Sequence, residues 1–498
     1  MIAVDNVLGA TPRGDGIVEF RVWAPAADSL RIRLNGIEHE LEACEDGFWG
    51  VDLAARHGDE YVYVVDGHDW PDPCSRWQPH GVRGPSAVVD LPRPAESVGL
   101  SLDDLVLYEL HVGTFSPEGT FDGVIPRLHE LRELGVTAIE LMPVATFPGD
   151  RGWGYDGFYT WAPHPAYGGP DGLLRLVEAA HREGLGVVLD VVYNHVGPGN
   201  EAVRAFGPYF TDRHETFWGD AIDYSEPAVR EWAIQNAEAW VSDYGIDGLR
   251  LDATHAVFDD SPRHVLAELA ERVRPALVVS EMETGDLRPI EEWGHDAQWA
   301  DELHHELHVL LTGEQDGYYA GYGSLGGLAR QLERTPPERL VVCSQNHDQV
   351  GNRAFGDRPR TAELRLRAAV TLFAPQTPLL FQGEEYGEQR PFLFFTDHID
   401  PAIADATREG RRREFAAFAA FSGEEVPDPQ ARETFERSKV DPAAGDEELR
   451  AFYRDLLALR RQLPREVSTS VEGRVLRVRR GDVELVADFD ALTAELRR

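Results

Sequence analysis

The sequence predicts an α/β fold, a (β/α)8 TIM barrel with an N-terminal β-sandwich and a small C-terminal β-domain. Two patterns along the chain predict it. Residues 1–90 consist of short runs in which apolar and polar residues alternate, separated by Gly, Asp and Pro, and such runs are typical of strands in a β-sandwich. From residue 105 onward, short apolar runs alternate with amphipathic helical stretches, which indicates parallel strands joined by crossover helices.

The N-terminal segment supplies the first domain. Its strand-like runs are GIVEFRVWAP, SLRIRLN, GFWGVDL and YVYVVDG. Because no convincing helix interrupts these runs, we expect residues 1–90 to form an immunoglobulin-like β-sandwich. Residues 91–104, where Pro and Ser are frequent, are expected to be a linker.

Residues 105–463 are expected to form the barrel, with long insertions at its rim. The open doubly wound sheet is disfavoured because no G-x-G-x-x-G follows the first strand. Residues 195–225 and 395–442 are long, irregular excursions, and loops of such length at the carboxyl rim of a barrel are usually functional. Residues 464–498 are expected to form a short C-terminal β-sheet of two or three strands. The eight candidate barrel strands are 105–112, 136–144, 186–194, 248–254, 276–282, 297–302, 339–348 and 377–385.

The acidic composition limits the possible partners. The 498 residues include 87 Asp and Glu against 48 Lys and Arg, a net charge of −39. Nucleic acids and anionic membranes bind basic surfaces, so the composition argues against both and suits a neutral ligand. The chain shows no secretory signal and no apolar run near the ~18–20 residues that span a bilayer. We therefore expect a cytoplasmic protein, either a monomer or a weak homodimer.

The three cysteines predict no special chemistry. Cys44, Cys74 and Cys343 lack metal-ligand spacing, so neither a disulfide nor a metal held by cysteines or needed for catalysis is expected, while binding of a structural calcium stays open. No cofactor is expected either, because the polar residues described next can act without one.

Polar residues gather where the predicted barrel strands end. In a barrel these ends converge on one pocket at the carboxyl face. Acidic side chains next to apolar strands are costly to bury, so several of them together imply a shared purpose. The residues are Asp190 and His195 on the third strand, Arg250, Asp252 and His255 on the fourth, Glu281 on the fifth, and His347 and Asp348 on the seventh.

Glycoside hydrolysis is one reaction that would use these residues. It needs one carboxylate near the anomeric carbon and one carboxylic acid at the leaving oxygen, ~5–5.5 Å apart in a retaining enzyme. Asp252 and Glu281 end adjacent strands and meet this requirement. Arg250 lies two residues before Asp252, on the same strand face, and would keep it ionised. Glu281 must carry a proton when substrate binds, which burial and neighbouring carboxylates favour.

Each of these residues taken alone has a more ordinary interpretation. A single Asp at the end of a barrel strand is more often structural than catalytic, and Asn and Asp are common in turns. The joint pattern is more specific, because R-x-D-x-x-H, a later Glu and a later His-Asp each end a predicted strand.

These segments resemble a known family. DVVYNH, GLRLDATH, VVSE and QNHD look like the four sequence regions of the α-amylase family, glycoside hydrolase family 13, and GVTAIELMPV resembles its extra region on strand two. The resemblance implies that Asp252 is the nucleophile, Glu281 the general acid/base and Asp348 the stabiliser of the transition state. It further implies a group of sugar-binding residues formed by Tyr155, Asp190, His195, Arg250, His255 and His347.

Longer blocks narrow the resemblance. PDPCSRWQPHGVRGPS, FPGDRGWGYDG, DAQWADELHHELH, FQGEEYGEQRPFLFFTDH and VPDPQARETFERSK are similar to segments of the maltooligosyltrehalose trehalohydrolases. The implied reaction cleaves the α-1,4 bond next to the terminal trehalose unit of maltooligosyltrehalose and releases trehalose. The implied partners are this substrate and related α-glucans, with the N-terminal domain of carbohydrate-binding type. The C-terminal sheet looks shorter than the one usual in that family.

Further residues and two other functions remain open. We expect Trp218, Arg353 and Phe355, which lie in rim segments, to contact substrate, although rim aromatics also simply pack long loops. A 1,4-α-glucan branching enzyme is the first alternative, with the same three carboxylates but a sugar acceptor in place of water. A noncatalytic glucan-binding barrel is the second, and it would be expected to lack the carboxylates that are present here.

Overall fold

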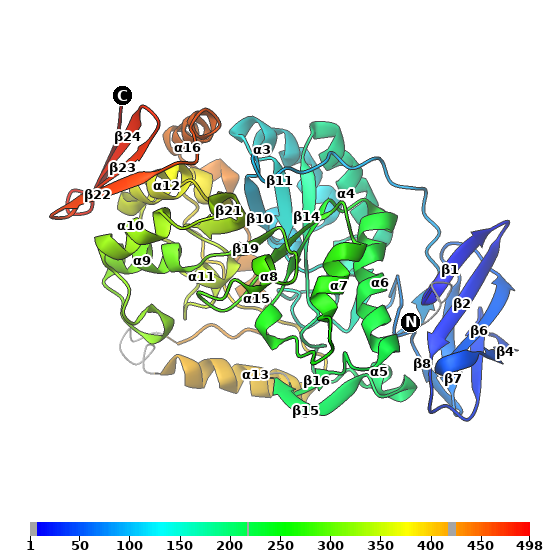
Figure 1. The fold of residues 1–498 in the computed structure, drawn as a ribbon. Coiled ribbons are helices and arrows are strands. Elements are labelled where there is room, and N and C mark those ends of the chain that lie inside the picture. Colours follow the sequence, from blue (N-terminus) through cyan, green and yellow to red (C-terminus); the bar gives the residue numbers. More distant parts are fainter. Residues whose placement is uncertain (1–6, 217–218, 417–424) are drawn as a thin grey trace.

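The computed structural model describes residues 7–216, 219–416 and 425–498. Two antiparallel sheets form the N-terminal domain, at one end of the molecule in Figure 1. Alternation such as that of Leu30–Leu34, where every second side chain is buried, puts one face of each sheet into a shared core. One sheet has the order β1 (Gly9–Gly14), β2 (Ile17–Trp23), β6 (Phe48–Ala54), β5 (Glu42–Ala43). The other has the order β4 (Ile37–Glu40), β3 (Leu30–Leu34), β7 (Glu60–Val65), β8 (His68–Trp70), with β9 (Ser86–Ala87) also paired to β7.

Eight parallel strands close into a barrel, which confirms the predicted fold class. The first strand pairs with the last, Leu107 lying opposite Leu379, so the barrel has no free edge. The strand residues are buried nearly without exception, as expected of strands covered by helices outside and packed side chains inside. The strands are β10 (Leu107–Leu110), β11 (Ala138–Leu141), β14 (Gly186–Val191), β17 (Gly248–Leu251), β18 (Leu277–Ser280), β19 (Ala297–Trp299), β20 (Leu340–Cys343) and β21 (Thr377–Phe381).

Helices surround the barrel and return the chain from each strand to the next (Figure 1). The two longest end at glycines in the left-handed conformation, Gly184 (φ 76°) and Gly245 (φ 75°), which turn the chain back into a strand. The covering helices are α3 (Leu128–Leu134), α4 (Gly169–Glu183), α6 (Pro227–Tyr244), α7 (Val265–Arg272), α9 (Glu302–Thr312), α10 (Leu325–Leu332), α12 (Leu364–Phe373) and α16 (Glu447–Arg460). Shorter elements are α1 (Val112–Phe115), α2 (Phe121–Val124), α8 (Arg288–Glu291), β12 (Ala145–Thr146) and β13 (Tyr159–Pro163).

The two long insertions contain more regular structure than the sequence predicts. Side-chain caps that the hydrophobic pattern does not show start helices in both: Asn200 accepts from the Val203 amide, and Asp400 from the Ala402 amide. Most of their elements lie along one edge of the molecule, at the bottom of Figure 1, whereas α15 is drawn nearer its centre. Their elements are α5 (Glu201–Phe206), β15 (Phe210–Thr216), β16 (Gly219–Ile222), α13 (Pro401–Glu414) and α15 (Arg432–Arg437).

The C-terminal sheet has four strands, one or two more than the sequence predicts. Its last strand is mostly exposed and polar, so it lacks the alternation by which half-buried strands are detected. Leu476 and Leu485 are buried in one apolar cluster with Phe373 of α12. The strands are β22 (Ser468–Glu472), β23 (Val475–Arg480), β24 (Val483–Asp488) and β25 (Thr493–Arg497).

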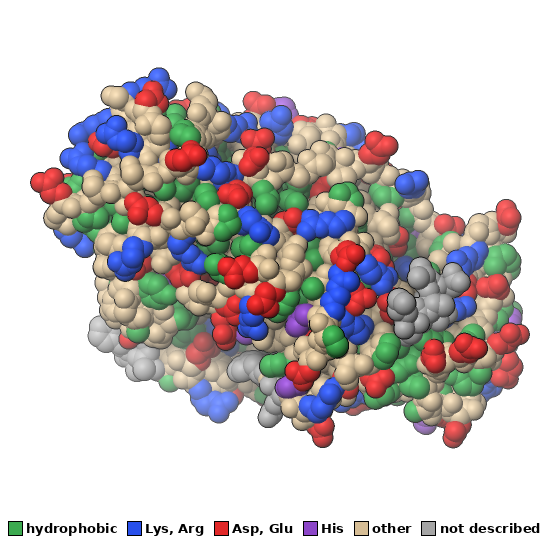
Figure 2. All heavy atoms as spheres, in the orientation of Figure 1, with side chains coloured by type: hydrophobic (Ala, Val, Ile, Leu, Met, Phe, Trp, Pro, Cys, Tyr) green, Lys and Arg blue, Asp and Glu red, His purple; other side chains and the backbone are tan. Residues whose placement is uncertain are grey.

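The surface carries charges of both signs. Figure 2 shows acidic and basic side chains interspersed over one face, with basic ones gathered over the C-terminal sheet. Cys44, Cys74 and Cys343 are free thiols. Among the described residues, no helix is both long and apolar enough to cross a membrane.

Candidate active site

The predicted catalytic residues lie just beyond the ends of the barrel strands. β17 ends at Leu251 and Asp252 follows it, while β18 ends at Ser280 and Glu281 follows. Asp348 lies further out, in the short helix α11 (His347–Gly351) after β20. Because parallel strands of a barrel end at one face, the three carboxylates lie around a common centre.

Arg250 binds three of the predicted carboxylates at once. Its guanidinium is completely buried and lies 4.2 Å above the Trp299 ring. Nη1 donates to Asp190 Oδ2 (2.7 Å) and Asp252 Oδ1 (2.9 Å), and Nη2 donates to Glu281 Oε2 (2.8 Å). Burial alone would lower the pKa of Arg250, but Asp190 and Glu281 raise it well above its ordinary value. Arg250 therefore stays charged and holds the nucleophile and acid candidates together.

The backbone after Asp252 takes an unusual conformation that helps to position Glu281. Ala253 is left-handed, with φ 40° and ψ 52°, a conformation that costs a residue with a Cβ about 1–2 kcal/mol. In this turn the Ala253 amide donates to Glu281 Oε2 (2.9 Å) and the Thr254 amide to the Glu281 carbonyl (3.0 Å). Both of the donors that contact the Glu281 carboxyl group among the described residues bind Oε2, so Oε1 remains available to a ligand.

Asp252 is held on both sides. Asn194, buried beyond the end of β14, donates from Nδ2 to Asp252 Oδ2 (2.8 Å), while Arg250 binds the other oxygen. The Asp252 side chain keeps 11% of its surface exposed. These two donors fix the orientation of both carboxyl oxygens of Asp252.

A buried ion pair underlies Asp348. His347 Nδ1 contacts Glu109 Oε1 (2.6 Å), and the His347 amide donates to Glu109 Oε2 (2.8 Å). On the other side, His347 Nε2 lies 2.8 Å from the Tyr155 hydroxyl and 3.4 Å from Asp348 Oδ1. Burial would lower the pKa of His347, but Asp348 and Glu109 raise it to about 10. His347 is therefore an imidazolium with both ring N–H groups engaged.

Tyr155 and Asp190 form a second layer beside this pair. The Tyr155 hydroxyl donates to Asp190 Oδ2 (2.7 Å), and its ring stacks on His347 with centroids 5.2 Å apart. Burial, opposed by Arg250 and helped by Asp252, raises the pKa of Asp190 to about 7. One face of the Tyr155 ring thus packs against protein, so its predicted stacking on a sugar depends on the other face and stays a prediction.

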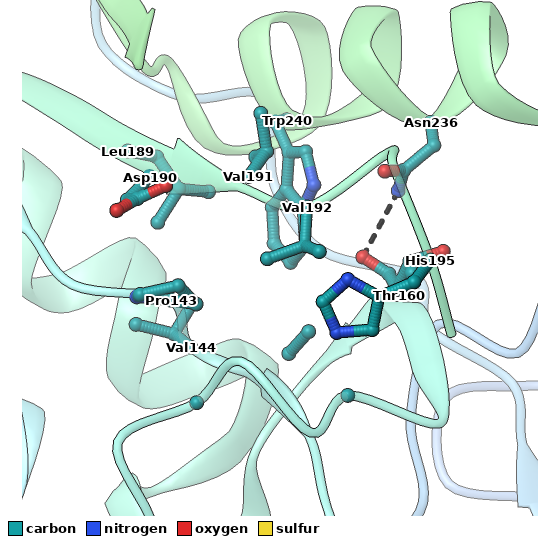
Figure 3. Close-up of a pocket in the computed structure, with 13 residues that line it drawn as sticks. Pro143, Val144, Thr160, Leu189, Asp190, Val191, Val192, His195, Asn236 and Trp240 are labelled. Carbon is teal, nitrogen blue, oxygen red and sulfur yellow. Dashed lines mark hydrogen bonds between the residues drawn. The ribbon is translucent and has the colours of Figure 1, made fainter. Parts of the chain in front are cut away.

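His195 forms part of the wall behind the site. Its Nε2 lies 2.8 Å from the Tyr155 carbonyl, and burial lowers the pKa of His195 to about 4, so the ring is neutral. A cavity of about 20 Å³ lies next to this ring, with Asp190 and Trp240 also on its wall. Figure 3 shows these lining residues. That volume holds about one water molecule. A sugar cannot enter this space. The residues around it, His195 included, therefore pack behind the site and hold its other residues in position.

The remaining predicted residues are not all brought to the same place. His255 is exposed, in the turn after Asp252. Arg353 donates to Glu314 (2.8 Å) and Asp357 (2.9 Å) and lines another cavity, which α11 borders. Phe355 is partly buried two residues later. Trp218 lies outside the described residues.

Three acidic residues near the site were missed by the sequence reasoning. Glu109 lies within β10, and Glu140 lies opposite it in β11, with both oxygens buried and without hydrogen-bond partners. Burial and Glu109 raise the pKa of Glu140 well above its ordinary value, so it is protonated. Asp301 follows β19, and burial, Glu281 and Asp348 raise its pKa to about 7. A carboxylate within or just after an apolar strand was the available signal.

Asp301 begins helix α9 without capping it. It occupies the N-cap position, yet its side chain makes no capping hydrogen bond. Its strand lies between those that carry Glu281 and Asp348, and these two are the charges that act on it most strongly.

Across the described ranges, no group of three or more His, Cys, Asp or Glu side chains could hold a metal ion.

Comparison with known proteins defines the class. Residues 94–207 match the family described as Alpha amylase, catalytic domain, and residues 7–80 match Carbohydrate-binding module 48 (Isoamylase N-terminal domain). Together with the closed barrel and the carboxylates at its strand ends, these matches define a glycoside hydrolase of the α-amylase type.

Long relatives define the group within that class. The malto-oligosyltrehalose trehalohydrolase of Deinococcus radiodurans is 43% identical over 95% of this chain and 87% of its own. That of Saccharolobus solfataricus is 41% identical over 90% and 86%. A crystal structure from Salmonella typhimurium, described provisionally as an alpha amylase, has a TM-score of 0.89 and 39% identity, covering 96% of this chain and 92% of its own. A branching enzyme of D. radiodurans is 28% identical over 78% and 65%. The chain belongs to the malto-oligosyltrehalose trehalohydrolase family.

Proposed function

We propose that this glycosidase cleaves the α-1,4-glucosidic bond next to the terminal trehalose unit of maltooligosyltrehalose, with retention of configuration, and releases trehalose. The names of its relatives support the substrate. The observation that carries the mechanism is the buried Arg250 guanidinium, which binds Asp252 through Nη1 and Glu281 through Nη2. One guanidinium can bind both carboxyl groups only if they lie close together, as a retaining pair must.

In the proposed first step, Asp252 Oδ attacks the anomeric carbon while Glu281 gives its proton to the departing glycosidic oxygen. The bond from the anomeric carbon to that oxygen breaks, trehalose leaves, and a glycosyl ester forms on Asp252. In the second step Glu281 takes a proton from water, and the water oxygen displaces Asp252 from the anomeric carbon. Asp348, paired with the His347 imidazolium, stabilises the positive charge that develops on the sugar in both steps.

The surrounding residues are proposed to bind the glucan ring next to the cleaved bond. Asp190 and His347 are rigidly held by Arg250 and Glu109, and the roles proposed for Tyr155, His195 and His255 follow from the family resemblance. We propose the domain division 1–90, 91–104, 105–463 and 464–498, with the first domain contacting α-glucan chains. A monomer or weak homodimer in the cytoplasm is also proposed.

The substrate is tested by comparing maltopentaose with maltotriosyltrehalose. We expect trehalose and maltotriose from the second and slow change in the first, because a pocket fitted to the trehalose turn would use its contacts to position the bond to be cleaved. Products are separated by chromatography. Equal cleavage of both would indicate a general amylase, and new α-1,6 linkages on amylose would indicate the branching enzyme.

The proposed roles are tested by Asp252→Asn and Glu281→Gln. Each variant keeps the shape of the side chain and removes the nucleophile or the proton donor, so turnover is expected to fall by at least ~10²–10⁴-fold. Asp455→Asn, on an exposed part of α16, is the matched control and should keep full activity. Near-normal turnover by either pure catalytic variant would contradict the assignment.

A further inference from the structure

A second cavity borders helix α11, the helix that also carries Asp348. It has a volume of about 300 Å³ and is lined by α9, by the residues after β20, by α11 and by the segment leading into α12. We call it the arginine cavity, because four arginines line it. They are Arg353, Arg358, Arg360 and Arg367.

The charges of the arginine cavity are not balanced. Glu363 pairs with Arg360 and Arg367, and Arg353 pairs with both Asp357 and Glu314. Arg358 has no carboxylate within ion-pair distance among the described residues. Its Nε donates to the Arg390 carbonyl (2.9 Å) and its Nη1 to Gln345 Oε1 (3.3 Å). Arg358 is half-buried. Shielding part of a guanidinium from water without a counter-ion is costly, and a negative ligand would offset that cost.

Several buried donors in this cavity lack partners. Arg358 Nη2 and Arg367 Nη1 are shielded from solvent and make no hydrogen bond, and Arg367 as a whole is 1% exposed. Ser344 Oγ and His304 Nδ1 are also buried and unpaired. Buried polar groups are nearly always hydrogen-bonded, so this many unpaired groups around one cavity indicates a missing acceptor.

We propose that the arginine cavity binds a small oxyanion of the phosphate class, held by Arg358 and Arg367. Guanidinium groups bind phosphate oxygens in bidentate, charge-assisted geometry, and Ser344 and His304 supply further hydrogen bonds. A neutral glucan fits less well, because it cannot balance a wall that has more cations than anions. The proposed sugar site of this barrel differs from this wall, since it is rich in carboxylates. The phosphoryl group can belong to free phosphate or to a small phosphorylated sugar, since about 300 Å³ accommodates either.

Calorimetric titration of the full chain with sodium phosphate, against sodium chloride at equal ionic strength, tests the proposal. We expect one saturable phosphate per chain. Arg358→Gln should weaken it at least tenfold while glucan hydrolysis continues, and Arg365→Gln, an exposed arginine of the same region outside the cavity, should not change it. Asp357→Asn removes a carboxylate from the wall and leaves Arg353 with Glu314 as its remaining ion-pair partner, so it should tighten binding several-fold.

Because Arg358→Gln and Asp357→Asn are expected to change the phosphate affinity in opposite directions, the test stays decisive. A variant damaged in folding loses binding but does not gain it, so Asp357→Asn decides even if Arg358→Gln folds poorly. Glucose 6-phosphate, titrated in parallel, shows by its affinity whether the free ion or a phosphorylated sugar is preferred, and binding of either supports the proposal. No saturable heat in the millimolar range would overturn it, as would equal effects of Arg358→Gln and Arg365→Gln, or competition between trehalose and phosphate.

Discussion

Replacing Arg250 by Met should destabilise the protein in a pH-dependent way. The guanidinium is completely buried and makes three charged hydrogen bonds of 2.7–2.9 Å, to Asp190, Asp252 and Glu281. Removing one partner of a buried ion pair costs about 3–5 kcal/mol, because the other charge is left uncompensated. Here three carboxylates lose their cation together. We therefore expect Arg250→Met to lower the free energy of unfolding by an amount at the upper end of that range at neutral pH.

The direction of the pH dependence follows from proton linkage. Without Arg250 the remaining carboxylates bind protons more tightly in the folded state than in the unfolded chain, where Asp and Glu titrate near ~3.9 and ~4.3. The pKa of Asp190, already about 7, rises further. A folded-state pKa above the unfolded value means that stability falls as pH rises between the two. The deficit of the variant should be small near pH 5 and large near pH 8.

The assay is thermal unfolding of wild type and Arg250→Met at pH 5 and pH 8. Arg365→Met serves as the control, because Arg365 is half exposed and lies 3.6 Å from its ion-pair partner Glu448. The control should lower the melting temperature little at either pH. The reasoning is refuted if Arg250→Met lowers the melting temperature equally at both pH values, or no more than the control.

Four further variants, at three positions, test other parts of the site. Glu109→Gln removes the carboxylate partner of His347. Because the pKa of His347 is about 10 in the folded protein, the stability that this pair gives is complete below pH ~6.5 and is lost as pH rises through 10. Between pH 7 and pH 10 the melting temperature should therefore fall less steeply in the variant than in the wild type. Asp301→Asn removes a negative charge beside Glu281, so the alkaline limb of the kcat/KM profile should move to lower pH, by up to about one unit. Ala253→Gly should stabilise by roughly 1 kcal/mol because Ala253 has φ 40°, whereas Ala253→Val should destabilise; equal melting temperatures would contradict the strain.

The fold could be predicted to the extent that burial shows in the sequence. All eight barrel strands lie inside the predicted segments, because parallel strands covered on both faces are continuous apolar runs. The predicted segments extend too far at their ends, since the extended chain continues past the hydrogen-bonded ladder into the polar residues of the site. β25 was missed for the opposite reason, because an exposed edge strand needs no apolar side chains.

The site was predictable where a charged residue directly follows a strong strand. Asp252 and Glu281 follow strands that are entirely buried, so their position shows in the sequence. Glu109 is inside such a strand, where alternation alone does not show which face it occupies. Asp301 follows β19, which has only three residues. Arg353 is near Asp348 in sequence, but its contacts with Glu314 and Asp357 lie beyond α11, which no sequence pattern shows.

The charge balance of the barrel mouth connects these residues to the chemistry. In the part of the chain that the structure describes, seven carboxyl groups surround two buried cations, Arg250 and His347. Burial keeps Glu140 protonated and gives Asp190 and Asp301 pKa values of about 7, so each of these two Asp residues carries about half a negative charge at pH 7. The carboxyl groups therefore outnumber the cations, and in the proposed mechanism the site has an excess of negative charge before the reaction begins. A transition state with positive charge on the sugar would restore the balance, whereas a neutral glucan would not, and we expect this difference to lower the barrier. The seven groups are Glu109, Glu140, Asp190, Asp252, Glu281, Asp301 and Asp348.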